Sequence, residues 1–288
     1  MKWKNRRQHF RSILDGDICV HPASVFDPIS ARIAEDLKFE CGILAGSVAS
    51  MAILGAPDLV LITLSELTEQ AHRINRASEI PLLVDGDHGY GNALNVYRTV
   101  EELETVGISA LTIEDTALPQ SSGNTGAVKL LSIEEGTGKM EAALSARKDS
   151  SLAIIGRTSA ALTGGLEEAI RRGKAYESAG VDAMFFVGIS DAEEIKLLAT
   201  EFNIPLLLGG NGSGILGDRN FLQSQNVRIS LQGHSPFLAS VNVIYETLKS
   251  LRHETPLKES VGGSHSSLVN EVIRADDYSS LMQKFLFK

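Results

Sequence analysis

Two aspartates separated by one glycine are the strongest candidates for chemistry in this sequence. Asp85 and Asp87 follow one apolar run, and Glu114 follows another. Alternate residues of an extended strand point to the same side, so the two aspartates would repel each other unless a cation lay near them. Oxygen ligands without cysteine suit Mg2+ or Mn2+ better than zinc. Because Mg2+ keeps several waters, we expect Asp85 to bind the ion directly and three acids to act through water, namely Asp58, Asp87 and Glu114.

Three more polar residues stand at the ends of apolar runs. A buried guanidinium must face a carboxylate of the protein or of a substrate, and the fork of Arg157 suits a substrate carboxylate. His234 could donate a hydrogen bond to the substrate or act as an acid, and Ser47 could hold an oxyanion. The structural alternatives are an ion pair for Arg157, a buried histidine for His234, and helix capping for the acids. Among the acids, Asp115 is the best candidate for a helix cap.

The elements that must position these residues are strands buried on both faces. Eight apolar runs are nearly continuous rather than alternating, which is typical of such strands. They cover residues 18–25, 41–47, 81–87, 110–116, 152–158, 183–188, 205–210 and 227–234. Helical spacing of apolar residues between the runs predicts helices at 30–37, 64–74, 93–106, 134–147, 166–179 and 191–202.

This alternation over about 250 residues predicts an α/β fold of the (β/α)8 TIM-barrel type, with an open doubly wound sheet as the competing architecture. A barrel of this type carries its reactive residues at the carboxyl ends of its strands. Five of the eight runs end in such a residue, namely Ser47, Asp85, Glu114, Arg157 and His234. The coincidence indicates an enzyme.

The composition is that of an ordinary globular protein. Of 288 residues, 43% are hydrophobic and 22% charged, which excludes a disordered chain, a collagen-like fibre and a disulfide scaffold. A net charge of -9 argues against a nucleic-acid partner, and no apolar run approaches the ~20 residues that span a membrane. Cys19 and Cys41 are interpreted as buried hydrophobes. The basic N-terminus predicts an amphipathic helix with Trp3, Phe10 and Leu14 on its apolar side, not a secretory signal, so we expect a cytoplasmic protein.

Several motifs, in the same order along the chain, resemble those of the isocitrate lyase and phosphoenolpyruvate mutase superfamily. They are SVFDPISARIAEDLKFECGILAGSVAS, DGDHGYGN, LTIEDT, IIGRTSA and the final GH of the eighth run. The resemblance runs from about residue 10 to 250. Within the superfamily, the sequence is most similar to the bacterial Mg2+-dependent oxaloacetate decarboxylases.

The resemblance implies a role for each candidate residue. Asp85 matches the metal ligand, and Ser47, Arg157 and His234 match substrate-binding positions. The water-mediated metal shell is matched by Asp58, Asp87 and Glu114. The resemblance also implies a homotetramer, a dimer of dimers, whose C-terminal helix is exchanged between subunits. We therefore expect a catalytic barrel at 1–258 and a helical extension at 259–288, after a hinge at Gly262-Gly263-Ser264.

Departures from the superfamily pattern narrow the expected reaction. Residues 118–126 contain neither the cysteine nor the histidine that isocitrate and methylisocitrate lyases carry in the corresponding loop. We expect decarboxylation of oxaloacetate, a small 2-oxo dicarboxylate, to pyruvate and CO2 through an Mg2+-bound enolate, with Mn2+ as the alternative ion. The glycine-rich turn 209–214 could instead cradle a phosphate. This turn keeps phosphonopyruvate hydrolase or phosphoenolpyruvate mutase chemistry open as an alternative. Two further alternatives are a lyase that acts on 2-hydroxy diacids and a barrel that binds a dicarboxylate without converting it.

Overall fold

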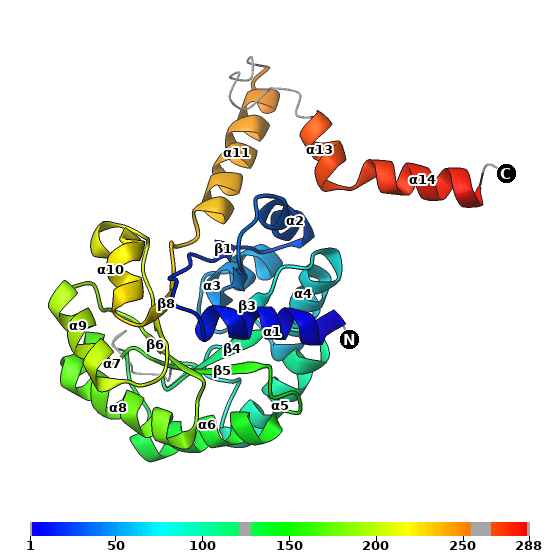
Figure 1. Cartoon of the computed structure of the whole chain (residues 1–288). Helices are drawn as coiled ribbons and strands as arrows, with labels where there is room; N and C mark the ends of the chain where they lie inside the picture. The colour runs from blue at the N-terminus through cyan, green and yellow to red at the C-terminus, as the bar shows by residue number, and fades with distance from the viewer. Residues whose placement is uncertain (1, 121–127, 255–265, 287–288) are drawn as a thin grey trace.

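Eight parallel strands follow one another around a barrel in chain order (Figure 1). The computed structural model describes residues 2–120, 128–254 and 266–286. Within these ranges the strands are β1 (Ala23–Ser24), β2 (Gly42–Leu44), β3 (Leu82–Asp85), β4 (Ala110–Glu114), β5 (Ala153–Thr158), β6 (Ala183–Phe186), β7 (Leu206–Leu208) and β8 (Val227–Ser230). The ring closes where the Val20 N–H donates to the Arg228 carbonyl at 2.8 Å and the Ser230 N–H donates to the Val20 carbonyl at 3.0 Å. The predicted (β/α)8 barrel is confirmed, and the open sheet is wrong.

The continuous apolar runs are explained by two separate cores. In β5, Ala153 and Ile155 belong to a cluster inside the barrel, whereas Ile154 belongs to the cluster between the strands and the outer helices. Both faces of each strand are therefore buried, so alternation with polar residues is not needed.

The helices surround the barrel and extend beyond it. They are α1 (Lys2–Leu14), α2 (Pro28–Asp36), α3 (Gly46–Ala49), η1 (Ser50–Leu54), α4 (Leu64–Ala77), α5 (Ala93–Thr105), α6 (Ile133–Ala146), α7 (Ala160–Thr163), α8 (Gly165–Ala179), α9 (Ala192–Glu201), η2 (Gly214–Gly217), α10 (Arg219–Ser224), α11 (Ser235–Arg252), α13 (Ser266–Val272) and α14 (Ala275–Phe285). Their starts follow local rules, since the side chains of Asp27, Thr63 and Asn92 cap α2, α4 and α5. Of these helices, none is both long and apolar enough to cross a membrane.

Two of the predicted strands are shorter than expected. The run at 18–25 forms only β1 and an isolated bridge at Val20, because Pro22 has no N–H to donate to a neighbouring strand. The run at 41–47 ends as a strand at Leu44, and Gly46 already begins α3. Ser47 therefore lies in the first turn of a short helix that sequence reasoning missed.

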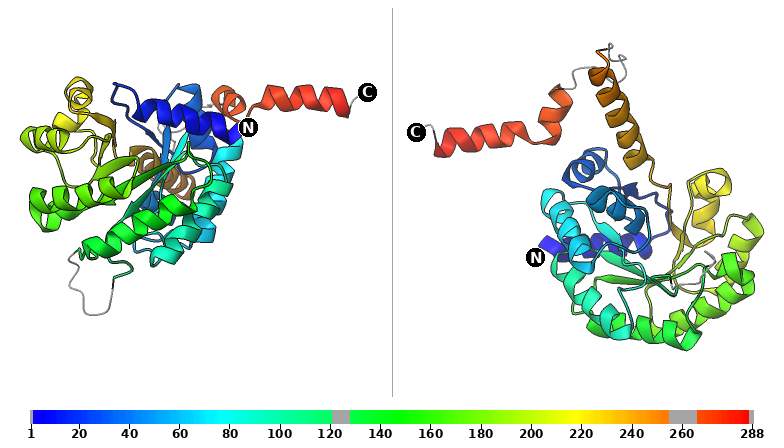
Figure 2. Two further views of the ribbon diagram at one scale, coloured as in Figure 1. Left: turned by 60° about the horizontal axis from the view of Figure 1, so that its bottom comes forward. Right: turned by 180° about the vertical axis from the view of Figure 1, so that it is seen from behind.

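The N-terminal helix α1 lies along one end of the barrel (Figure 2). This is the amino end of the strands, because Arg11 donates to the carbonyl of Leu152, the residue before β5. Phe10 and Leu14 are buried in the cluster inside the barrel, and Trp3 lies so close to Gly107 that a Cβ there would be 2.3 Å from the indole. Arg7 is 5% exposed and donates to the Ile108 carbonyl at 2.9 Å, to the Glu104 carbonyl and to the carboxylate of Asp149. The predicted amphipathic helix thus closes the barrel with both apolar contacts and buried hydrogen bonds.

Helix α11, which follows the last strand, stands away from the barrel (Figure 1). None of its residues is buried, and large apolar side chains along it are exposed: Leu238, Val241, Val243, Ile244, Tyr245, Leu248 and Leu251. Beside its base lies a groove lined by Phe26, Ile29, Ile33 and Leu37 among others.

The predicted hinge at 262–264 lies outside the described residues. Helix α13 contacts α2, where Arg32 donates to the Val272 carbonyl at 3.2 Å.

The contacts of α1 generate a prediction about stability. Replacing Arg7 by methionine removes a buried donor from the Ile108 and Glu104 carbonyls and from Asp149 Oδ2, so we expect Arg7→Met to lower the free energy of unfolding by about 3 kcal/mol. The control is Arg98→Met, which removes an exposed ion pair with Glu102 and should cost less than about 0.5 kcal/mol. Urea denaturation of both variants measures the difference, and equal losses would contradict a closing role for Arg7.

Candidate active site

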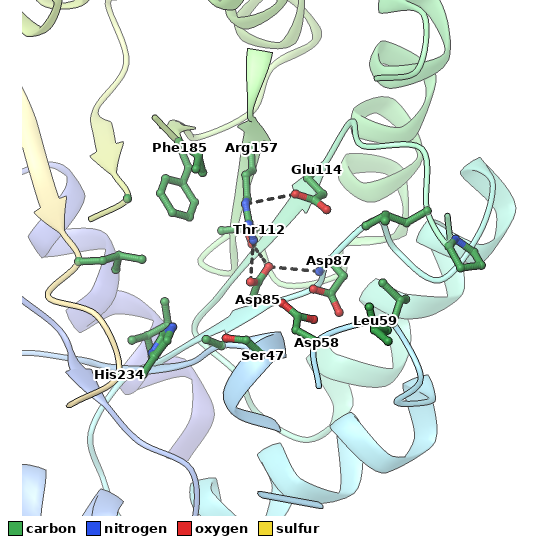
Figure 3. Close-up of a pocket in the computed structure, with 18 of the residues that line it drawn as sticks. Ser47, Asp58, Leu59, Asp85, Asp87, Thr112, Glu114, Arg157, Phe185 and His234 are labelled. Carbon is green, nitrogen blue, oxygen red and sulfur yellow. Dashed lines mark hydrogen bonds and ion pairs between the residues drawn. The ribbon is translucent and has the colours of Figure 1, made fainter. Parts of the chain in front are cut away.

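A cavity of about 740 Å3 opens at the carboxyl ends of the strands (Figure 3). Strand ends and the loops after them supply its walls, as expected for an active site in this fold. Every residue that the sequence predicted for the site lines this cavity, namely Ser47, Asp58, Asp85, Asp87, Glu114, Arg157 and His234. The structure therefore brings together residues that are up to 187 positions apart, from Ser47 to His234.

At the centre of the cavity, Arg157 pairs with acids from the two preceding strands. Its Nη1 donates to Asp85 Oδ2 at 2.6 Å, and its Nε lies 3.3 Å from Glu114 Oε2. Burial opposes ionisation of Asp85, but the charge and hydrogen bond of Arg157 outweigh it and hold the pKa of Asp85 below its ordinary value. Thr112 and the Asp87 N–H also donate to Asp85, at 3.0 and 3.2 Å. Asp85 is thus fixed as a carboxylate.

The surroundings of the other three acids oppose their ionisation. Burial, and next the charge of Asp85, raises the pKa of Asp87 well above its ordinary value. Burial also raises the pKa values of Asp58 and Glu114, and Asp85 adds to both shifts. Like charges that crowd one cavity in this way favour a cation among them.

The donor set fits a hard, hydrated cation. It consists of carboxylate oxygens, which Mg2+ and Mn2+ prefer. Among the described residues, no three His, Cys, Asp or Glu side chains converge closely enough to enclose a metal ion by themselves. A magnesium ion that keeps several waters needs only one or two direct carboxylates, so the open arrangement suits it.

Glycines allow the acids to approach one another. Asp87 has the left-handed backbone angle φ of 46°, which directs its carboxylate against the start of α3. A Cβ at Gly46 would lie 2.5 Å from Asp87 Oδ1, so only glycine leaves room for this carboxylate. At Gly86 a Cβ would lie 2.6 Å from the Thr112 carbonyl, which accepts the Gly86 N–H at 3.0 Å. The Asp-Gly-Asp spacing therefore has a steric reason as well as a chemical one.

On the other side of the cavity, His234 is held by a residue that sequence reasoning missed. Its Nδ1 lies 3.1 Å from the hydroxyl of Ser24 at the end of β1. Burial lowers the pKa of His234, although Asp85 and Asp58 act in the opposite direction. The position of Ser24 at a strand end was the signal that could have identified it. His234 is therefore an imidazole that Ser24 orients and whose protonated form burial disfavours.

One further contact shapes the surroundings of Arg157. The ring of Phe185 on β6 lies beneath the guanidinium, with 5.3 Å between Cζ and the ring centroid. A cation held against an aromatic face stays in place while its N–H groups bond to acceptors in the plane of the guanidinium. Phe185 lies within the apolar run 183–188, so its position gives no signal of a functional role.

The expectation that Asp115 caps a helix is wrong. Ser132 caps α6, the next helix, whereas Asp115 is fully buried behind the cavity. Its Oδ2 accepts hydrogen bonds from Arg172 at 2.9 Å, Tyr176 at 2.7 Å and Thr158 at 3.1 Å. Asp115 is a buried ion-pair partner because its side chain points toward α8, away from the cavity that Glu114 faces.

The two loops that the sequence analysis singled out reach the cavity only in part. Leu118, Pro119 and Gln120 line it, and residues 121–127 lie outside the described part of the chain. From the turn 209–214, Gly209 and Gly210 line the cavity. The side chain of Asn211 then accepts both the N–H and the hydroxyl of Ser213, so this amide is directed to the turn itself.

Comparisons with known proteins agree with this geometry. A family model described as phosphoenolpyruvate phosphomutase matches residues 10–252. Two curated relatives named oxaloacetate decarboxylase are each 52% identical to this chain. The one from Rhodopseudomonas palustris (strain BisB18) matches over 96% of this chain and 95% of its own length, and the one from Bradyrhizobium diazoefficiens over 95% and 94%.

Solved structures show the same fold at lower identity. Oxaloacetate acetylhydrolase in complex with the inhibitor 3,3-difluorooxalacetate has a TM-score of 0.86 at 26% identity, covering 98% of this chain and 97% of that one. Phosphonopyruvate hydrolase in complex with oxalate and Mg2+ has a TM-score of 0.82 at 27% identity, covering 98% and 99%. As the motifs predicted, the chain belongs to the phosphoenolpyruvate phosphomutase family, within the isocitrate lyase and phosphoenolpyruvate mutase superfamily.

Proposed function

We propose that this protein decarboxylates oxaloacetate to pyruvate and CO2 with the help of a divalent cation. Two relatives named oxaloacetate decarboxylase match nearly the whole chain at 52% identity. The observation in the structure that supports the proposal most directly is the charge distribution of the cavity. Four carboxylates line it, and Arg157 is the only lysine or arginine among its described lining residues.

This charge distribution suits a substrate that must lose one of its two carboxylates. Arg157 can bind one carboxylate, whereas a second one finds no further lysine or arginine among the described lining residues. A carboxylate that enters the cavity without a cationic partner loses hydration, and release of CO2 relieves this cost. Breaking the C3–C4 bond leaves its electron pair on the keto acid as an enolate. Addition of a proton at C3 then gives pyruvate.

The residues divide into those that hold the cation and those that hold the substrate. Asp85 would bind Mg2+, or Mn2+ in its place, directly, while Asp58, Asp87 and Glu114 would act through water. The cation would supply a Lewis acid that polarises the 2-oxo group. Arg157 binds a substrate carboxylate, and His234 and Ser47 donate hydrogen bonds to substrate oxygens. Phosphonopyruvate hydrolase chemistry is less well supported, because the described lining of the cavity holds no lysine or arginine besides Arg157.

We also propose the organisation implied by the family. Residues 1–258 form the catalytic barrel and 259–288 the helical extension. A homotetramer, built as a dimer of dimers with C-terminal helices exchanged, is supported by the exposed apolar face of α11 and the groove beside it. Sedimentation equilibrium measures the subunit number. A cytoplasmic location is supported by two buried free thiols, Cys19 and Cys41, and is tested by cell fractionation.

The central test is a coupled pyruvate assay with purified protein and oxaloacetate. We expect pyruvate release that requires Mg2+ or Mn2+, stops with EDTA and exceeds the uncatalysed rate in a protein-free blank containing the same metal. The Asp85→Ala variant should fold and be inactive, because it lacks the direct ligand. Phosphate release from phosphonopyruvate is measured in parallel. A protein that releases phosphate faster than it releases pyruvate, or that matches the blank, refutes the proposal.

The contact between Gly46 and Asp87 gives a second prediction. A methyl group at position 46 must displace the Asp87 carboxylate, so we expect Gly46→Ala to raise the Mn2+ dissociation constant at least tenfold. The control is Gly138→Ala in α6, where a Cβ meets nothing within 4 Å and metal binding should not change. Electron paramagnetic resonance of free Mn2+ measures both. If Gly46→Ala binds Mn2+ with wild-type affinity, the assignment of Asp87 to the metal shell is wrong.

A third prediction concerns Arg157. Lysine keeps the charge but not the planar fork, so we expect Arg157→Lys to lower kcat/KM at least tenfold with little change in melting temperature. The two readouts distinguish a substrate-binding arginine from a structural one. If the ion pairs with Asp85 and Glu114 are only structural, the variant will instead keep its kcat/KM and melt at a lower temperature.

A further inference from the structure

The loop after β3, residues 86–91, has an unusual backbone conformation. Four of its residues have positive φ angles, namely Asp87 at 46°, Gly89 at 76°, Tyr90 at 62° and Gly91 at 148°. Residues with side chains rarely adopt this region unless the surroundings hold them there. The orientation of the Asp87 carboxylate depends on this conformation, so the contacts that hold the loop also determine the cavity.

The loop is held at each of four successive carbonyl groups. The Gly86 carbonyl accepts the Gly89 N–H at 2.9 Å, and the Asp87 carbonyl accepts the Glu114 N–H at 2.9 Å. The Gly89 carbonyl accepts the hydroxyl of Thr99 at 3.1 Å. The remaining one, that of His88, accepts a hydrogen bond from Lys139 Nζ at 2.8 Å. Lys139 belongs to α6, so it connects the loop to another element of the barrel.

Lys139 is unusual for a lysine in an outer helix. It is 2% exposed, and no other lysine whose side chain the structure describes is buried. Lysines are almost never fully buried unless their charge has a partner. The acids near enough to act on it are Glu135, on its own helix, and Glu114 and Asp115, at the end of β4. Its ammonium group therefore lies between the loop and the acidic strand end.

We propose that Lys139 is a positioning residue that holds the loop after β3 in the conformation that directs Asp87 into the cavity. The ammonium group fixes the His88 carbonyl, which belongs to the residue next to Asp87. Lys139 is not among the residues that line the cavity, so its effect passes through the loop. The effect on turnover rests on the proposed decarboxylase function, whereas the effects on loop dynamics and cation binding do not.

The test compares three variants. Lys139→Met keeps the apolar stem and loses the donor, Lys139→Arg keeps a charged donor of different shape, and Lys148→Met removes an exposed lysine that pairs with Glu101. For Lys139→Met we expect faster hydrogen exchange in residues 86–91 of the metal-free protein. We also expect a Mn2+ dissociation constant at least tenfold higher and a kcat at least tenfold lower than in the wild type, with a smaller change in KM. Lys139→Arg should recover part of each loss, and Lys148→Met should match the wild type.

A purely structural role predicts a different result. In that case Lys139→Met lowers the melting temperature, while exchange in the loop and Mn2+ binding stay within twofold of the wild type, and the proposal is overturned. Should Lys139→Met fail to fold, Lys139→Gln, which keeps a neutral donor, is judged by the same two measurements. If the wild type shows no decarboxylase activity, hydrogen exchange in the loop and Mn2+ binding still decide the role of Lys139.

Discussion

The ion pair between Arg157 and Asp85 is the interaction around which the site is organised. Four carboxylates line one cavity, and a single guanidinium neutralises part of their charge. Such an arrangement is unfavourable for folding, because buried like charges raise one another's pKa and oppose desolvation. It persists because Asp85 and Arg157 lie on strands, whose backbone positions are fixed by their neighbours in the barrel. A site on rigid strands keeps its geometry while a cation or a substrate changes its charge.

The two ends of the barrel have different roles: the end closed by α1 contributes stability, and the end with the cavity carries the chemistry. At the closed end, Arg7 and Arg11 of α1 donate to backbone carbonyls and pair with acids such as Asp149 and Asp182. The charges there are paired within the protein, so they need no ligand to balance them. At the open end, burial raises the pKa values of Asp58 and Asp87, and the negative charge of Asp85 raises them further. The stability of the first end makes the charge imbalance of the second one tolerable.

Most of the barrel and the residues of the site were predictable, because a buried parallel strand has a simple pattern. An apolar run followed by a polar residue marks both a strand and its carboxyl end, as at Arg157. The pattern failed where a different constraint acted. Pro22 interrupts the first strand, and Asp115 points away from the cavity although Glu114, its neighbour in sequence, faces it. The separation of α11 from the barrel was also unpredicted, since a helical pattern does not identify which surface the helix will cover.

Residues whose importance depends on three-dimensional contacts were invisible for a related reason. In a helix sequence, a lysine is ordinarily a solvent-exposed residue, so nothing marked Lys139 before its contact with the His88 carbonyl was seen. Gly46 likewise has meaning only beside the Asp87 carboxylate. Both exceptions to local rules adjoin the loop after β3, where Asp87 itself has a left-handed backbone. Local exceptions that gather around one carboxylate indicate that the fold is adapted to hold this carboxylate rather than to minimise strain.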